Sequence, residues 1–110
     1  MRRTLPAWRK AVSLTVFTSP TCTLCEPTKF VCRKVGNDFN KKYGRLVVDY
    51  SEVDITSSSN IKWKELYEYK IPVVHINSTK FWSASINENK LSEKKLKHTL
   101  EEDITLLSEP

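Results

Sequence analysis

The chain has 110 residues, of which 39% are hydrophobic, 10% aromatic and 28% charged, enough for one domain and too few for two with separate cores. Its formal charge of +5 comes from basic residues scattered among acidic ones, without a basic face interleaved with aromatic residues, so we expect no nucleic-acid partner. No apolar run is long enough to span a bilayer and no signal-peptide core is present, so we expect a soluble cytoplasmic protein without a membrane partner.

The N-terminal residues 1–12 are basic, and no acidic residue precedes Glu26. Because Pro6 interrupts any helix, we interpret residues 1–12 as a solvated tail ahead of a single domain over residues 13–107. The alternative is a mitochondrial presequence, which an Arg-rich and acid-free start also resembles. The basic residues of the tail are Arg2, Arg3, Arg9 and Lys10.

The first half of the domain predicts a strand, a helix and a strand. Residues 13–18 (SLTVFT) are rich in β-branched and aromatic residues and are closed by Pro20, which predicts a strand. Residues 24–39 carry apolar side chains at helical spacing, and residues 45–55 predict the second strand. Residues 56–60 (TSSSN) form a loop with helix-capping residues. The expected apolar face of the helix consists of Phe30, Val31, Val35 and Phe39.

The second half predicts a short helix, a hairpin and a final helix. Residues 61–69 (IKWKELYEY) show helical spacing. Residues 73–76 and 80–84 predict two antiparallel strands joined by a turn at residues 77–79. The final helix ends the chain, and its apolar face consists of Leu96, Leu100, Ile104 and Leu107.

The order βαβαββα predicts an α/β fold, a small four-stranded mixed sheet flanked by three helices. Helices between the first three strands imply right-handed crossovers and parallel pairing at the start of the sheet. The hairpin then adds an antiparallel edge.

All three cysteines lie within eleven residues, and Cys22 and Cys25 have C-x-x-C spacing. An odd number crowded into one stretch argues against a framework of structural disulfides. Cys22 falls in the loop that leaves the first strand, and Cys25 falls at the first turn of the helix, where free N–H groups stabilise a thiolate. Cys22 would then be the nucleophile, and Cys25 could attack a mixed disulfide formed on Cys22. Cys32 lies on the same helical face as Cys25, so we expect it in the core.

Residues around the pair modify these expectations. Lys29, one turn beyond Cys25, favours a thiolate, whereas Glu26 opposes one. Thr23 and Glu26 have the spacing of a capping box, but Pro27 removes an intrahelical hydrogen bond, so the helix either begins later or is kinked.

Three segments together resemble a glutaredoxin of the thioredoxin superfamily. They are LTVFTS, CTLC with Lys29 four residues beyond it, and KIPVV around Pro72. The resemblance extends over residues 14–100 and is closest to a little-characterised glutaredoxin-like subfamily with a CxLC dithiol motif. It implies a thioredoxin-like fold and a thiol–disulfide oxidoreductase with Cys22 as nucleophile and Cys25 as resolving thiol.

The resemblance also implies a substrate site. Pro72 would be a cis-proline facing the disulfide, and the backbone of Ile71 would pair with an incoming thiol peptide. Thr23, Leu24 and Lys29 would contact the same substrate. The implied partners are protein thiols or disulfides, and we expect a monomer without a bound cofactor.

Glutathione is kept as an alternative co-substrate and partner, but it does not follow from this sequence. Glutaredoxins commonly carry a lysine three residues before the first cysteine to hold the glutathione carboxylate, and that position is Ser19 here. After the hairpin they usually have a Gly-Gly turn and an acidic residue, whereas this chain reads NSTKFWSASINEN.

Two other functions use the same cysteines. One is a redox-inactive binding module, and the other is a metal or iron–sulfur protein. A metal site needs about four ligands, and the chain has no second C-x-x-C and no H-x-x-x-H, so we expect no metal. We expect His75 to be a partly exposed structural residue on the strand face opposite Val74, and His98 to be solvated. The aromatic residues expected in or at the edge of the core are Trp63, Tyr67 and Trp82.

Overall fold

The computed structural model describes residues 11–77, 79–84 and 91–107. Most of the predicted basic tail therefore lies outside the described residues, and the first strand begins one residue earlier than expected. The order of strands and α-helices is the predicted βαβαββα. The elements are β1 (Val12–Thr18), α1 (Cys25–Tyr43), β2 (Val48–Asp54), the short 3-10 helix η1 (Ser58–Asn60), α2 (Ile61–Tyr67), β3 (Val73–Ile76), β4 (Thr79–Ser83) and α3 (Glu93–Leu107).

The four strands form one mixed sheet in the order β2-β1-β3-β4. Strands β1 and β2 are parallel, whereas β3 is antiparallel to both β1 and β4. The expected parallel pairing of the first three strands is therefore wrong for β3. The 19 residues of α1 extend over about 28 Å and return the chain to the start of the sheet. The seven residues of α2 extend over only about 10 Å, so β3 starts from the end at which β2 stops.

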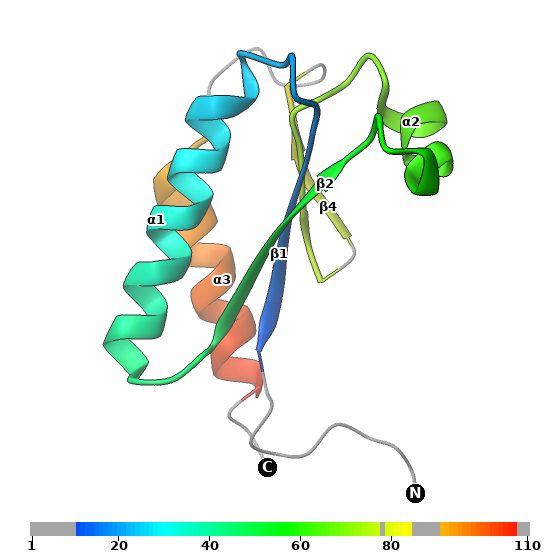
Figure 1. Ribbon diagram of the computed structural model, residues 1–110. Coiled ribbons are helices and arrows are strands. Elements are labelled where there is room, and N and C mark those ends of the chain that lie inside the picture. The colour runs from blue at the N-terminus through cyan, green and yellow to red at the C-terminus, as the bar shows by residue number, and fades with distance from the viewer. Residues whose placement is uncertain (1–10, 78, 85–90, 108–110) are drawn as a thin grey trace, which may run out of the picture.

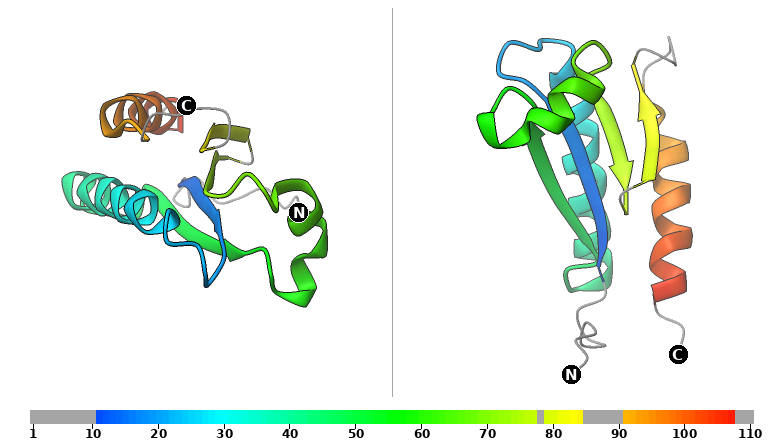
Figure 2. Two further views of the ribbon diagram at one scale, coloured as in Figure 1. Left: turned by 90° about the horizontal axis from the view of Figure 1, so that it is seen from above. Right: turned by 90° about the vertical axis from the view of Figure 1, so that its right-hand side faces the viewer.

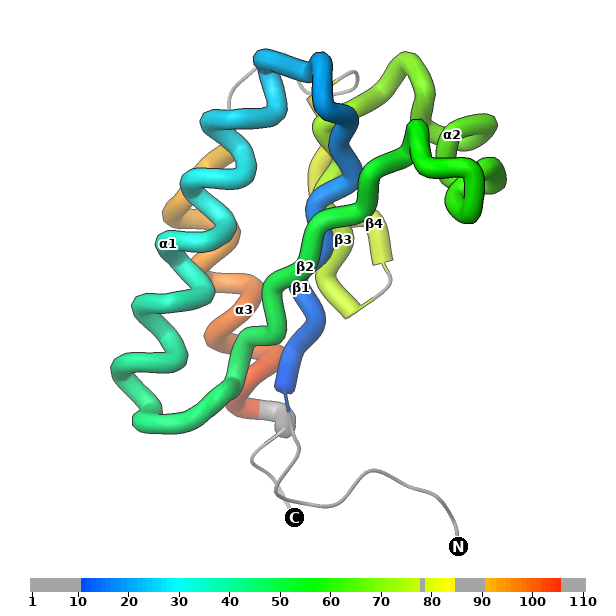
Figure 3. Tube along the Cα trace, in the orientation of Figure 1, coloured from blue at the N-terminus to red at the C-terminus, as the bar shows by residue number. Residues whose placement is uncertain are grey.

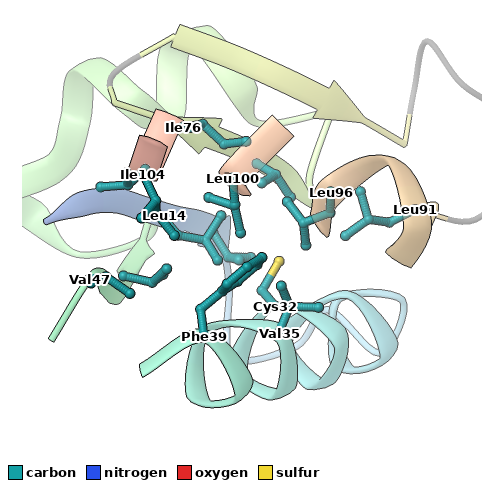
Figure 4. Packing of buried hydrophobic residues seen from close by; sticks show 14 residues of the cluster. Leu14, Cys32, Val35, Phe39, Val47, Ile76, Leu91, Leu96, Leu100 and Ile104 are labelled. Atoms are coloured by element: carbon teal, nitrogen blue, oxygen red, sulfur yellow. The ribbon is translucent and has the colours of Figure 1, made fainter. Parts of the chain in front are cut away.

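The helices form layers on the two faces of the sheet. Helices α1 and α3 cover one face and α2 lies on the other (Figures 1 and 2). The larger core lies between the sheet and the α1/α3 layer, where Figure 4 shows Leu14 of β1 against Cys32 and Phe39 of α1 and Leu100 of α3. A smaller cluster of Phe17, Ile55, Tyr67 and Val73 lies under α2. From β1, Val12, Leu14 and Val16 face the larger core and Phe17 faces the smaller one, as the pleat requires.

Helix α1 is longer than the sequence predicted, and three of the four residues expected on its apolar face lie in or against the core. It begins at Cys25, and Gly44, with φ of 67°, ends it in the left-handed conformation that glycine adopts at low cost. Phe30 was expected in the core but is 62% exposed. The buried positions include Thr28 and Cys32 beside the expected Val35 and Phe39, and Phe30 lies about 160° around the helix from Cys32.

The final helix matches its predicted face. Leu96, Leu100 and Ile104 are buried, and the hydroxyl of Ser92 accepts a hydrogen bond from the N–H of Lys95 at 3.2 Å, which caps α3. The side chain of Leu107 lies outside the described residues. Within the described residues, none of the helices is both long and apolar enough to cross a lipid bilayer.

Candidate active site

Cys22 and Cys25 form a disulfide, and their Cα atoms are 5.4 Å apart. The loop between β1 and α1 folds them together by two local hydrogen bonds. The N–H of Cys22 donates to the carbonyl of Ser19 at 3.2 Å, across a turn with Pro20 at its second position. The N–H of Cys25 then donates to the carbonyl of Cys22 at 3.3 Å. The backbone of the loop therefore holds the two sulfur atoms in bonding range.

The two sulfur-bearing residues differ in accessibility. Cys25 is the first residue of α1 and is fully buried, whereas Cys22 lies outside the helix and is partly exposed. Among the described residues, the backbone N–H groups of Thr23 and Leu24 have no hydrogen-bond acceptor. These donors, next to Cys22 and at the positive end of α1, can stabilise a thiolate there. A partner can thus approach Cys22 and not Cys25.

The expected capping box is absent from the start of α1. Leu24 is the N-cap residue, and no side chain accepts a capping hydrogen bond at this end. Pro27 is the third residue of α1, where its missing N–H would have had no intrahelical acceptor in any case. The proline therefore neither delays nor breaks the helix.

Glu26 is instead paired with Lys29. The Lys29 ammonium lies 2.8 Å from the Glu26 carboxylate, and the side chains are 15% and 65% exposed, respectively. The hydrogen bond and the positive charge of Lys29 lower the pKa of Glu26. The two charges that favour and oppose a thiolate thus offset each other beside the pair.

The loop that contains Pro72 reaches the same end of the sheet. The Ile71–Pro72 peptide bond is cis, as the family resemblance implied. Phe17 pairs with Val73 in the β1–β3 ladder, so Pro72 lies across from Thr18, where the cysteine loop begins. Figure 3 shows that the chain after β1 and the chain before β3 both run along this end. Among the described residues, the backbone N–H and C=O of Ile71 have no hydrogen-bond partner.

Sequence reasoning missed an aromatic cluster on the α2 face. Phe17, Trp63, Tyr67 and His75 have ring centroids 4.6 to 5.8 Å apart. The Tyr67 hydroxyl and His75 Nε2 are 2.7 Å apart and share a hydrogen bond. The i, i+4 spacing of Trp63 and Tyr67 was a signal that α2 covers an apolar surface.

His75 lies deeper than the sequence predicted. Its side chain faces away from Val74, as expected, but it is buried under α2 rather than partly exposed. Burial, helped by the charge of Lys80, lowers the pKa of His75, so the neutral imidazole is favoured. His98 is exposed, as expected, and lies 3.4 Å from Glu102. Trp63, Tyr67 and Trp82 all pack in or against the cores, which confirms that prediction.

Cys32 lies in the larger core and is fully buried, which confirms the expected location. Its burial raises the pKa of the thiol to about 12, so the thiolate is strongly disfavoured. Within the described part of the chain, no three His, Cys, Asp or Glu side chains are grouped closely enough to hold a metal ion.

Solved structures with this arrangement are thioredoxin-fold proteins. The first two thioredoxin domains of Saccharomyces cerevisiae Eps1p are 21% identical, with a TM-score of 0.58 over 86% of this chain and 36% of that chain. Oxidised thioredoxin O2 from Arabidopsis thaliana is 18% identical, with a TM-score of 0.56 over 84% of this chain and 75% of that chain. A selenoprotein W-related protein from Vibrio cholerae is 9% identical, with a TM-score of 0.58 over 86% and 99% of the two chains.

These identities establish the fold alone, and the chain spans little more than a third of the Eps1p chain. The sequence comparison is more specific, because residues 13–101 match the model of the family described as Glutaredoxin-like domain (DUF836). Since that match extends over most of the chain, the protein belongs to the glutaredoxin-like domain family, and it has a thioredoxin-like fold.

Proposed function

We propose that this protein is a thiol–disulfide oxidoreductase in which Cys22 is the nucleophile and Cys25 the resolving thiol. The observation that carries the proposal is the asymmetry of the disulfide: Cys22 is accessible beside free N–H donors, and Cys25 is buried at the first position of α1. A structural staple needs no such difference, whereas exchange needs one sulfur within reach of a partner and one protected from it.

When a partner reduces the Cys22–Cys25 disulfide, a partner thiolate attacks Sγ of Cys22. The bond between Cys22 and Cys25 breaks, Cys25 leaves as a thiolate and takes up a proton, and a mixed disulfide joins the partner to Cys22. A second thiol of the partner then attacks the partner's sulfur in the mixed disulfide, and Cys22 is released. The partner's two thiols have become a disulfide, and their two protons and two electrons are now on Cys22 and Cys25. The reverse sequence oxidises the pair and reduces a partner disulfide.

The partner class we propose is a protein thiol or disulfide, without dependence on glutathione. Ser19 offers a hydroxyl, 3.5 Å from that of Thr21, at the position where glutaredoxins commonly carry a lysine. Glutaredoxins carry the Gly-Gly turn after the hairpin. In this chain, residues 85–90 of that segment lie outside the described residues. The unpartnered backbone of Ile71 favours an extended polypeptide, because a passing chain could supply both missing hydrogen bonds.

The test is to trap the mixed disulfide. Cys25→Ser leaves Cys22 without a resolving thiol, so it should accumulate a stable mixed disulfide with a peptide disulfide substrate. Cys22→Ser should abolish exchange, because the remaining Cys25 thiol is buried. Cys32→Ala is the matched control and should retain exchange, since Cys32 lies in the core. Intact-protein mass spectrometry after alkylation in a graded dithiothreitol buffer measures all three variants.

Two outcomes would contradict the proposal. One is a wild-type pair that stays reduced at every accessible potential. The other is stoichiometric zinc bound to reduced Cys22 and Cys25, measured by elemental analysis, which would favour a metal role for the same cysteines.

A further inference from the structure

The most exposed apolar side chains of the described residues lie at the disulfide end of the molecule. Tyr69 is 89% exposed and Leu24 is 73% exposed, more than any other large apolar residue there. Scattered exposed apolar residues need no explanation, but the two most exposed ones at the functional end of a fold do. For comparison, Leu46, which is 59% exposed, lies just before β2, at the opposite end of the sheet.

Both residues belong to the two loops that border the disulfide. Leu24 lies between Cys22 and Cys25, and Tyr69 lies three residues before Pro72. The β1–β3 register brings the Pro72 loop across from the start of the cysteine loop. The right-hand view in Figure 2 shows both loops at the same end of the molecule. A chain that reaches Cys22 and pairs with Ile71 therefore runs along both of the loops that carry Leu24 and Tyr69.

The charges of this end do not favour a small anionic thiol. The cysteine loop from residue 19 to residue 24 (SPTCTL) contains no charged side chain. The nearest cation along α1, Lys29, is neutralised by Glu26 at 2.8 Å. On the other side, the exposed residues Glu68 and Lys70 flank Tyr69 with opposite charges. Apolar contact is therefore the attraction that both sides of Cys22 share, and it is proportional to the apolar area that a partner can bury.

We propose that Leu24 and Tyr69 determine specificity by packing against large apolar side chains next to the reacting cysteine of a polypeptide partner. This inference rests on the proposed function, because it concerns the partner of the same disulfide. The partner is thus an extended segment in which apolar residues flank a cysteine. Leu24 contacts one flank, Tyr69 contacts the other, and the backbone of Ile71 sets the direction of the segment.

The experiment compares two peptide thiols of equal length and charge, one with leucine and one with serine on both sides of a single cysteine. Each peptide reduces the oxidised protein, and acid quenching, alkylation and mass spectrometry give the rate constant. Each value is divided by the rate constant of the same peptide with a small aromatic disulfide, which removes differences in intrinsic thiol reactivity. With the wild-type protein, we expect the leucine peptide to react about tenfold faster, since burying an apolar side chain contributes this order of preference.

Leu24→Ser and Tyr69→Ser should each lower the leucine-to-serine ratio about threefold or more. Leu46→Ser is the matched control, a similarly exposed leucine at the far end, and should keep the wild-type ratio. A wild-type ratio near one, or equal ratios in all three variants, would overturn the inference. Failure of the proposed function is separate: in that case dithiothreitol itself would not reduce the Cys22–Cys25 pair.

Discussion

At the scale of single residues, burial separates the three thiols of this chain. Cys25 and Cys32 are both fully buried, seven residues apart on α1. Cys25 is bonded to a sulfur that solvent can reach, whereas Cys32 is surrounded by the side chains of the larger core. The same residue type therefore forms a disulfide at one position and packs in the core at the other.

Cys32 should be unreactive in the native oxidised protein. Burial raises its pKa to about 12, so at pH 8 almost none of it is thiolate. Iodoacetamide should label it only after unfolding, as measured by mass spectrometry. Cys32→Ala should lower the free energy of unfolding by about 1 kcal/mol or more, because it removes packed volume from the core. Rapid labelling of the folded protein would contradict this assignment.

His75 should make the stability of the protein depend on pH. Its folded pKa is depressed by burial, while in the unfolded chain it titrates near its ordinary value of about 6.5. The unfolded state therefore binds more protons as the pH falls below about 6.5. The contribution of His75 to stability is complete above that pH and is lost progressively on acidification, by at most about 1.4 kcal/mol per pH unit.

Urea unfolding of two variants between pH 7.5 and pH 5 measures this dependence. His75→Gln should flatten the curve of unfolding free energy against pH relative to the wild type. His98→Gln, which changes an exposed histidine on α3, is the matched control. It should keep the wild-type dependence of the unfolding free energy on pH. Parallel curves for His75→Gln and the wild type would show that the titration lies elsewhere.

At the scale of elements, one side chain joins α1 to β2. Asn40 Oδ1 accepts hydrogen bonds from the N–H of Val47 at 2.7 Å and of Val48 at 2.9 Å, and Asn40 Nδ2 donates to the carbonyl of Val48 at 3.1 Å. Nearby, a Cβ added to Gly36 would lie 3.2 Å from Val48 Cγ1, so the helix and strand are close. These contacts position the long helix that carries Cys25.

Asn40→Ala should lower the free energy of unfolding by about 1 to 2 kcal/mol. It removes three hydrogen bonds and leaves partly buried backbone groups without partners. Asn37→Ala, at an exposed position of the same helix, makes the same gain in helix propensity and should change stability by less than about 0.5 kcal/mol. The difference between the two variants in urea unfolding isolates the contribution of the hydrogen bonds. Equal values would mean that Asn40 contributes nothing beyond helix propensity.

At the scale of the whole molecule, recognition of glutathione would need groups from two distant parts of the chain. The position before the cysteines holds Ser19, and the segment after β4 lacks the Gly-Gly sequence. We therefore expect activity in the hydroxyethyl disulfide assay coupled to glutathione reductase to be weak or absent, because the lysine and the Gly-Gly turn that usually hold the glutathione carboxylates are missing. Dithiothreitol reduction of the same protein is the positive control. Robust glutathione-dependent turnover would refute this prediction.

Much of the fold was predictable because local patterns are strong in this chain. The β-branched and aromatic residues of β1 predict the strand, and the apolar stripe of α3 predicts both the helix and its buried face. The C-x-x-C spacing at a strand-to-helix boundary was sufficient to locate the disulfide. Each of these features depends on neighbours within about ten residues, and such neighbours are visible in a sequence.

Other features depended on contacts between distant segments. The position of the sheet decides which side of α1 is covered, although the helical period already places Phe30 about 180° around the helix from the buried Phe39. The burial of His75 follows from α2 folding over β3.

The sequence by itself determined the order of elements, the redox motif and the family, because these are written in local spacing and residue type. The tertiary structure alone decided the direction of β3, the depth of His75 and the neighbours of the disulfide. The direction of β3 follows because α2 is too short to return the chain to the start of the sheet, and this depends on two elements compared with each other. Likewise, Leu24 and Tyr69 are 45 positions apart in the chain and come to one end only because β1 and β3 pair. Such proximity arises from chain packing, which local pattern does not encode.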